Sequence, residues 1–363
     1  MPPRRLRCNV AMQDRWRISL VTIARDEAPR LARLLASVSP WVDEMVVLDT
    51  GSRDETAAIA AAAGARVGHF VWCDDFAAAR NAALDLAGAD WHLVLDADEW
   101  LMTGAEVLQQ LRRTAPTFVG SIALLDHFDD GRPRTAHQRL TRVLPGAVRY
   151  AGRVHEQPQH GLPTWTLALQ VGHDGYLPER LQAKRGRNRR LLAQARAETA
   201  GDDGYLWYQT GKDAAVYEDH AEAETAFARV AALLGPGTSR PPWWTDLVAR
   251  RLFALKRLGR HAQGLELAAD ELQRCDGSPD FFFALGDLLL DWAAEEPARA
   301  GELLPMIEQA WSRCLAIGEQ PGLPGAVAGR GSFLAAHNLA LVYEGTGRVA
   351  EAAAVRGRHR APA

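Results

Sequence analysis

Short apolar runs alternate with helix-type segments over the first hundred residues of the chain. Residues 45–48 and 91–95 are typical of strands buried on both faces. Residues 18–23 form a short, β-branched strand, and residues 66–70 can form a further strand. Between them lie segments with helical leucine spacing or a high alanine content: residues 31–38, 55–63 and 75–86. This alternation predicts a parallel, doubly wound α/β sheet with right-handed crossovers. Three of the four strands end in or near a carboxylate, namely Asp26, Asp49 and Asp96.

The pattern changes after residue 100. Shorter strands are predicted in this part: residues 121–125, 138–144, 148–151 and 167–172, with a hairpin turn at 129–133. From residue 177 onward the periodicity is helical. Several segments there match the residue spacing of tetratricopeptide (TPR) repeats, the first with Trp207, Gly211, Ala223 and Phe227. We therefore expect stacked helix pairs, with a plain bundle of alanine-rich helices as the alternative.

Glycine and proline mark the predicted connections within the helical part, at residues 235–242 and 318–331. We expect a flexible leader at residues 1–17, a sheet domain at 18–176 and a helical, TPR-like domain at 177–363. A basic run at residues 184–190 is typical of a solvated helix face. The alternative is a surface for an anionic acceptor or a membrane.

Composition excludes several classes of protein. Hydrophobic residues make up 47% and charged residues 24% of the chain, as in ordinary globular proteins. The net charge of −3 provides no basic field, so we expect no nucleic-acid partner. No apolar run approaches the roughly 18 residues that span a bilayer, and no signal-type apolar core follows the first residues. The four cysteines are far apart, so we expect reduced thiols and a cytoplasmic location, with peripheral association at the inner membrane face as a variant.

The fourth strand ends in a cluster of acidic residues. Asp96, Asp98 and Glu99 follow the apolar run, at the sheet edge where open α/β folds bind ligands. Carboxylates this close repel each other unless a cation lies between them. Asp96 and Asp98 therefore predict a site for Mn²⁺ or Mg²⁺ shared with substrate phosphates. An acidic loop without a metal is the alternative.

The usual phosphate-binding loops are missing from the sheet domain. No Gly-x-Gly-x-x-Gly follows the first strand, and no Gly-x-x-x-x-Gly-Lys loop occurs in the chain. A cation held by Asp96 and Asp98 would replace such a loop. This favours a ligand with a diphosphate group that binds through a metal ion.

Four motifs in the expected order resemble the family 2 glycosyltransferases. These motifs are Val-Thr-Ile-Ala-Arg-Asp-Glu, Val-Val-Leu-Asp-Thr-Gly-Ser-Arg-Asp-Glu-Thr, Asp-Phe-Ala-Ala-Ala-Arg-Asn and Leu-Asp-Ala-Asp-Glu, within residues 18–175. The downstream Arg-Val-His-Glu and the helical tail are similar to a subgroup with lipopolysaccharide-core transferases and peptide S-glycosyltransferases. The resemblance implies a GT-A fold, a nucleotide-sugar donor with UDP-sugars favoured, inversion at the anomeric carbon and a role such as cell envelope biosynthesis.

The resemblance also implies roles for individual residues. Asp49 matches a position that hydrogen-bonds the base or ribose, and Arg80 one near the base and diphosphate. Asp26 matches a position at the mouth of the base pocket. Asp96 is expected to contact both the nucleotide sugar and the metal ion. Each has a structural alternative: a turn at Asp49, an exposed helix arginine at Arg80 and a helix cap at Asp26.

An inverting transferase needs a base that takes the proton of the acceptor. Glu156 is our candidate, with Glu99 as the rival base or as a residue that orients the acceptor. We assign His155 to the metal shell with Asp96 and Asp98, and His173 is its alternative. A surface glutamate and structural histidines are the competing interpretations.

We thus expect a metal-dependent inverting glycosyltransferase that moves sugar from a nucleoside-diphosphate sugar to a glycan, a lipid-linked sugar or a peptide. The helical repeats would bind the acceptor or a protein partner. The first alternative is a non-catalytic, TPR-type interaction protein with a nucleotide-binding sheet domain. A nucleotidyltransferase is the second alternative, disfavoured because Ala24-Arg25-Asp26-Glu27 is not a glycine-rich loop.

Overall fold

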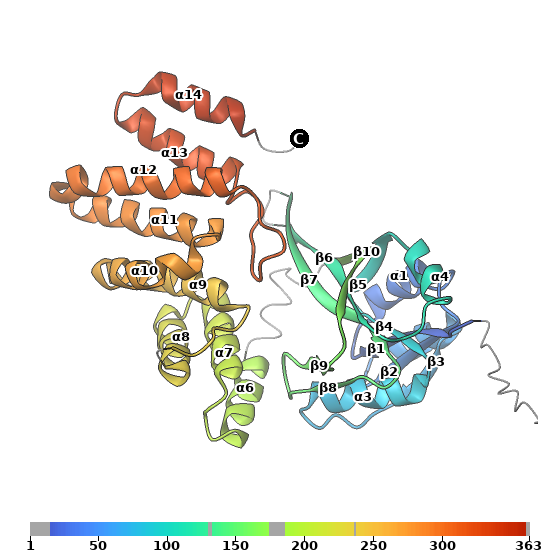
Figure 1. Cartoon of the computed structure of the whole chain (residues 1–363). Helices are drawn as coiled ribbons and strands as arrows, with labels where there is room; N and C mark the ends of the chain where they lie inside the picture. Colours follow the sequence, from blue (N-terminus) through green and yellow to red (C-terminus); the bar gives the residue numbers. More distant parts are fainter. Residues whose placement is uncertain (1–14, 130–132, 174–185, 236, 361–363) are drawn as a thin grey trace, which may run out of the picture. The chain divides into compact units, whose positions relative to one another are not determined.

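The computed structural model describes residues 15–129, 133–173, 186–235 and 237–360 (Figure 1). The described chain forms two units. The first contains residues up to 123 with 140–151 and 156–173, and the second contains 124–139, 152–155 and the residues after 173. The predicted leader up to residue 14, the boundary at 176/177 and the turn residues 130–132 lie outside the described residues.

The core of the first unit is a mixed sheet. Its first four strands along the chain are parallel to one another: β1 (Ile18–Ala24), β2 (Glu44–Asp49), β3 (Arg66–His69) and β4 (Trp91–Val94). Four further strands complete the sheet: β5 (Glu99–Thr103), β6 (Val119–Asp129), β7 (Pro133–Pro145) and β10 (Thr164–His173). The strand order is β3-β2-β1-β4-β7-β6-β10-β5, with β7 antiparallel to β4 and β10 antiparallel to β5. A separate ribbon pairs β8 (Arg149–Ala151) with β9 (Gln157–Gln159).

Helices α1 (Ala28–Val38), α2 (Thr56–Ala62) and α3 (Phe76–Ala87) connect the parallel strands. Figure 1 shows α1 and α3 on opposite sides of these strands, which is the doubly wound arrangement. The Asp75 side chain caps α3 by accepting from Ala78 N at 2.9 Å, and Gly88 ends this helix in the left-handed region, with φ 54°. The predicted α/β fold class is confirmed.

The structure adds three elements to the first unit that the sequence pattern did not predict: β5, β9 and the helix α4 (Glu106–Leu111). β5 is the last strand in the sheet order and pairs with β10 alone. Met102 and Thr103 at its end are exposed. An edge strand with exposed residues lacks the continuous apolar run by which the parallel strands are recognised.

The second unit contains a series of helices. These are α6 (Arg187–Glu198), α7 (Gly204–Val216), α8 (His220–Leu234), α9 (Trp244–Arg257), α10 (His261–Cys275), α11 (Pro279–Glu295), α12 (Ala300–Ile317), α13 (Phe333–Gly345) and α14 (Val349–Arg358), with a short 3₁₀ turn at Pro297–Arg299. Each helix from α6 to α14 packs against the next one in the chain. The predicted connectors at residues 235–242 and 318–331 lie between α8 and α9 and between α12 and α13.

Close approach of paired helices explains the small residues of the repeat pattern. A Cβ on Gly211 of α7 would lie 2.4 Å from a ring carbon of Phe227 in α8. On Gly286 of α11 it would lie 2.6 Å from the Trp311 ring in α12. Glycine therefore lets the large partner ring pack directly against the backbone. The expected helical-repeat tail is confirmed, and no described helix is long and apolar enough to cross a membrane.

Candidate functional site

The carboxyl ends of β1, β2 and β4 meet at one edge of the sheet because these strands run parallel. Ala24 at the end of β1 is in register with Asp49 at the end of β2. Leu95, just after β4, donates its backbone N–H to Val21 of β1. The acidic residues that follow these strands therefore share one sheet edge, as the sequence predicted.

Hydrogen bonds through the turn after β2 link Asp26 and Asp49. The Asp49 side chain accepts from the backbone N–H of Ser52 at 3.1 Å and also from its hydroxyl. Ser52 Oγ accepts from Asp26 N at 3.0 Å, and Asp26 Oδ1 accepts from Arg53 N at 2.7 Å. Asp26 has φ 54°, in the left-handed region. Both carboxylates thus shape the loop, and their nucleotide-binding roles stay predictions.

Asp96 is held between two buried arginines. Arg80 of α3 donates to Asp96 Oδ1 at 2.6 Å, and Arg142 of β7 donates to Asp96 Oδ2 at 2.8 Å. Burial alone would raise the pKa of Asp96, but the positive charges of Arg142 and Arg80 outweigh it and hold the pKa well below its usual range. Asp96 is therefore an ionised carboxylate that two arginines hold in position, and a third of its side chain is exposed.

Glu99 lies deeper, on the other side of Arg142. Its Oε1 accepts from Arg142 at 2.9 Å, and its Oε2 accepts from Asp96 N at 2.8 Å. Its side chain is 1% exposed. Burial raises the pKa of Glu99 to about 7; Arg142 acts against this shift and Asp96 adds to it. Each oxygen of Glu99 accepts one hydrogen bond within the network, so Glu99 helps to hold Arg142 and the Asp96 backbone in place.

Glu156 joins the same network from the segment before β9. Arg80 donates from Nε to Glu156 Oε1, so Arg80 bridges Glu156 and Asp96. The chain of charges runs Glu156, Arg80, Asp96, Arg142, Glu99 and contains three carboxylates and two cations. The candidate base Glu156 therefore lies in the same charged network as Asp96.

Asp98 lies beside a histidine. His173, the last residue of β10, places Nε2 at 3.5 Å from Asp98 Oδ2, and both side chains are largely buried. His155, the histidine we assigned to the metal shell, belongs to the second unit, where its carbonyl accepts from the Tyr205 hydroxyl at 3.4 Å. Burial, helped by the charge of Lys212, lowers the pKa of His155 to about 4. Of the two histidines considered, His173 is the one paired with Asp98.

Sequence reasoning missed Arg142 and Tyr150. Arg142 is 8% exposed and Tyr150, in β8, is 6% exposed. The ring of Tyr150 lies 5.5 Å from the Arg80 guanidinium. Arg80 Nη1, Arg142 Nε and Tyr150 Oη are buried with no hydrogen-bond partner among the described residues. No local motif surrounds Arg142 or Tyr150, because antiparallel pairing and the β8–β9 ribbon bring them to the network.

Residues 19–166 match the family model described as glycosyl transferase family 2. A TPR repeat-containing protein of Synechococcus elongatus is 39% identical over 208 residues, which cover 53% of this chain and 51% of that protein. The glycosyltransferase SunS of Bacillus subtilis is 28% identical over 183 residues, covering 47% and 43%. The chain thus spans about half the length of these relatives.

A solved structure of glucosyl-3-phosphoglycerate synthase from Mycobacterium tuberculosis is 26% identical to part of the chain. The alignment covers 31% of this chain and 44% of that one, with a TM-score of 0.25. A TM-score this low supports no conclusion about the present chain.

Proposed function

We propose that this chain, whose residues 19–166 form a family 2 glycosyltransferase domain, transfers a sugar from a nucleoside-diphosphate sugar to an acceptor with the help of a divalent metal ion. The observation that carries the proposal is the pairing of Asp98 with His173 beside the charged network around Asp96. A cation site next to buried guanidinium groups suits a diphosphate, which has several negative oxygens to neutralise.

The donor atoms present fit Mn²⁺ or Mg²⁺. Asp98 Oδ2 and His173 Nε2 lie 3.5 Å apart, a separation that two ligands of one ion at about 2.1 Å each can adopt with a small adjustment. Bound there, the ion would neutralise charge on the diphosphate leaving group. Asp96 engages both oxygens with arginines, although each oxygen can accept a second bond. We therefore assign Asp98 and His173 to the metal, ahead of His155, and assign Asp96 to the donor as well as to the two arginines.

We assign the nucleotide to the edge formed by Asp26, Asp49 and Arg80. Asp49 is 6% exposed and already accepts from Ser52, so it would offer its remaining lone pairs to the base or ribose. Arg80 Nη1 is a buried donor without a protein partner among the described atoms, and an incoming phosphate would satisfy it.

For the base we favour Glu156 over Glu99. Glu99 is buried, and both of its oxygens accept hydrogen bonds within the network. The side chain of Glu156 is 10% exposed, and the only hydrogen bond described for it is made by Oε1 with Arg80. Oε2 of Glu156 would take the proton as the acceptor attacks the anomeric carbon opposite the diphosphate, which inverts this centre.

The helical repeats would hold the acceptor or a protein partner. A glycan, a lipid-linked sugar and a peptide are the acceptor classes to test. A second candidate function is that of a non-catalytic interaction protein that binds nucleotide without turnover. The relative named for its TPR repeats favours this alternative.

A panel of nucleotide sugars separates these functions. The full chain is incubated with each donor and Mn²⁺, with and without chelator, and the products are identified by mass spectrometry. We expect free nucleoside diphosphate, released only with metal and faster with the correct acceptor. In a parallel incubation with a nucleoside triphosphate and a sugar 1-phosphate, release of pyrophosphate would indicate a nucleotidyltransferase. Calorimetric binding of nucleoside diphosphate without turnover of any donor would favour the interaction protein.

A further inference from the structure

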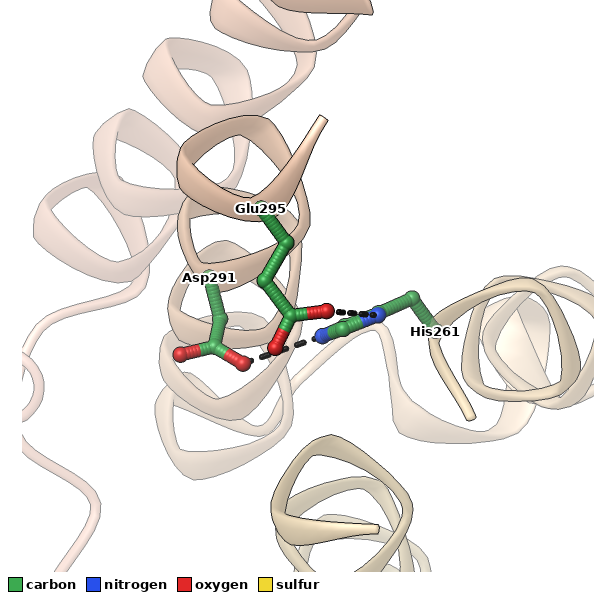
Figure 2. A group of neighbouring side chains, drawn as sticks. All are labelled: His261, Asp291 and Glu295. Atoms are coloured by element: carbon green, nitrogen blue, oxygen red, sulfur yellow. Dashed lines mark hydrogen bonds and ion pairs between the residues drawn. The ribbon is translucent and has the colours of Figure 1, made fainter. Parts of the chain in front are cut away.

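Three side chains of metal-binding type meet between α10 and α11 of the helical unit. His261 is the first residue of α10, and Asp291 and Glu295 lie one turn apart at the end of α11 (Figure 2). One ligand atom from each lies within 4.8 Å of the others. Among the residues that the structure describes, no other three histidine, cysteine or acidic side chains gather in this way.

The imidazole of His261 is fixed in place and faces a carboxylate with each nitrogen. Nε2 lies 3.0 Å from Asp291 Oδ2, and Nδ1 lies 3.7 Å from Glu295 Oε2. The ring stacks on Trp292, with centroids 5.8 Å apart and planes 13° from parallel. His261 is 4% exposed. A neutral imidazole carries one N–H, so it satisfies one of these carboxylates and turns a lone pair toward the other.

The helix that carries Asp291 and Glu295 does little to offset the negative charges of these two residues. Asp291 and Glu295 have (i, i+4) spacing, which is unfavourable for like charges. Both lie near the carboxyl end of α11, where the helix dipole disfavours negative charge, and the last turn has no basic residue. Asp287, one turn earlier, is instead neutralised by Lys256 at 2.5 Å. For Asp291 and Glu295, His261 is the one ion-pair partner found within the described part of the chain.

We propose that His261, Asp291 and Glu295 bind a divalent transition metal ion of the Zn²⁺ class, which joins α10 to α11. One imidazole nitrogen and two carboxylate oxygens make a ligand set that Zn²⁺ accepts, with water in the fourth position. The 3.0 Å between Nε2 and Asp291 Oδ2 is close to the separation of two ligands each about 2.0–2.2 Å from one ion. Asp291 and Glu295 have 42% and 61% exposed side chains, so the ion and its water can enter from solvent.

The competing state is an imidazolium hydrogen-bonded to Asp291 without any metal. The test is a Zn²⁺ titration of the full chain after chelator treatment, by equilibrium dialysis with metal analysis. Wild type is compared with Asp291→Asn and Glu295→Gln. Both side chains are partly exposed at the surface, so these substitutions should leave the fold intact. Asp287→Asn is the matched control, because it removes the same charge from the same face of α11.

We expect Asp291→Asn and Glu295→Gln to weaken one Zn²⁺ site by at least roughly tenfold, and Asp287→Asn to leave that site within a factor of two. Zn²⁺ should also raise the melting temperature of wild type and the control but not of the two ligand variants. Equal Zn²⁺ affinity in all four proteins, or no Zn²⁺ bound by wild type, would overturn the proposal and leave the imidazolium pair.

Discussion

Replacement of Arg142 by methionine should destabilise the sheet unit strongly. Arg142 is 8% exposed and donates to Asp96 at 2.8 Å and to Glu99 at 2.9 Å. Asp96 would keep Arg80, but the Glu99 carboxylate would lose its only cationic hydrogen-bond partner among the described residues. Removing one member of a buried ion pair costs about 3–5 kcal/mol, because the remaining charge stays desolvated. We expect a loss in this range in the free energy of unfolding.

The assay is urea unfolding at pH 8, where Glu99, with its pKa near 7, is mostly ionised. A double-mutant cycle with Glu99→Gln isolates the pair, because glutamine removes the buried charge and can still accept from Asp96 N. Arg142→Met should cost about 1–3 kcal/mol less in the Glu99→Gln background. Arg17→Met is the control, since Arg17 pairs with Glu44 at the surface with 58% of its side chain exposed, and it should cost at most about 1 kcal/mol. If Arg142→Met costs no more than Arg17→Met, the buried network does not stabilise the unit as argued.

Three further outcomes are expected. Asp49→Ala should weaken nucleoside-diphosphate binding by about 1–3 kcal/mol in calorimetry, and unchanged affinity would reject its nucleotide role. Glu156→Gln should lower kcat roughly 10²–10⁴-fold with donor affinity retained, whereas a defect found in Glu99→Gln alone would transfer the base to Glu99. Burial, assisted by Arg149, lowers the pKa of His92 from 6.5 to about 4, so the neutral ring is favoured in the fold. The contribution of His92 to the free energy of unfolding is therefore present above pH 6.5 and is lost as the pH falls toward 4. At 1.4 kcal/mol for each unit of pKa shift, this contribution amounts to about 3 kcal/mol. His92→Leu should remove that part of the acid sensitivity in urea unfolding between pH 7 and 4, and an identical pH profile would contradict it.

Local patterns were enough to predict the parallel half of the sheet and the helical tail. The apolar runs of β1, β2 and β4 are buried and continuous, and Asp75 and Gly88 mark both ends of α3 with cap chemistry. β3 lies at the edge of the sheet, and none of its residues is buried. The carboxylates after β1, β2 and β4 could be assigned to one edge because parallel strands end on the same side. These features depend on residues close together in the chain.

Long-range pairing could not be predicted in the same way. Arg142 reaches Asp96 across 46 positions because β7 runs antiparallel beside β4. His173 meets Asp98 because β10 pairs with β5, with His173 in register with Glu99. Nothing in the spacing of His155 and His173 tells which histidine lies next to the acidic edge. Strand register decides it, and the apolar pattern of an edge strand such as β5 is too weak to fix that register.

The central claim is that Asp98 and His173 hold the metal ion used in sugar transfer. The most direct measurement is the Mn²⁺ dependence of nucleoside-diphosphate release from the preferred nucleotide sugar, compared for wild type, Asp98→Asn, His173→Gln and His155→Gln. We predict that Asp98→Asn abolishes metal-dependent release, that His173→Gln raises the Mn²⁺ concentration needed by at least roughly tenfold, and that His155→Gln has a wild-type Mn²⁺ profile. Full activity of Asp98→Asn in the presence of chelator would contradict the metal role, and a shifted Mn²⁺ profile in His155→Gln alone would return the histidine ligand to His155.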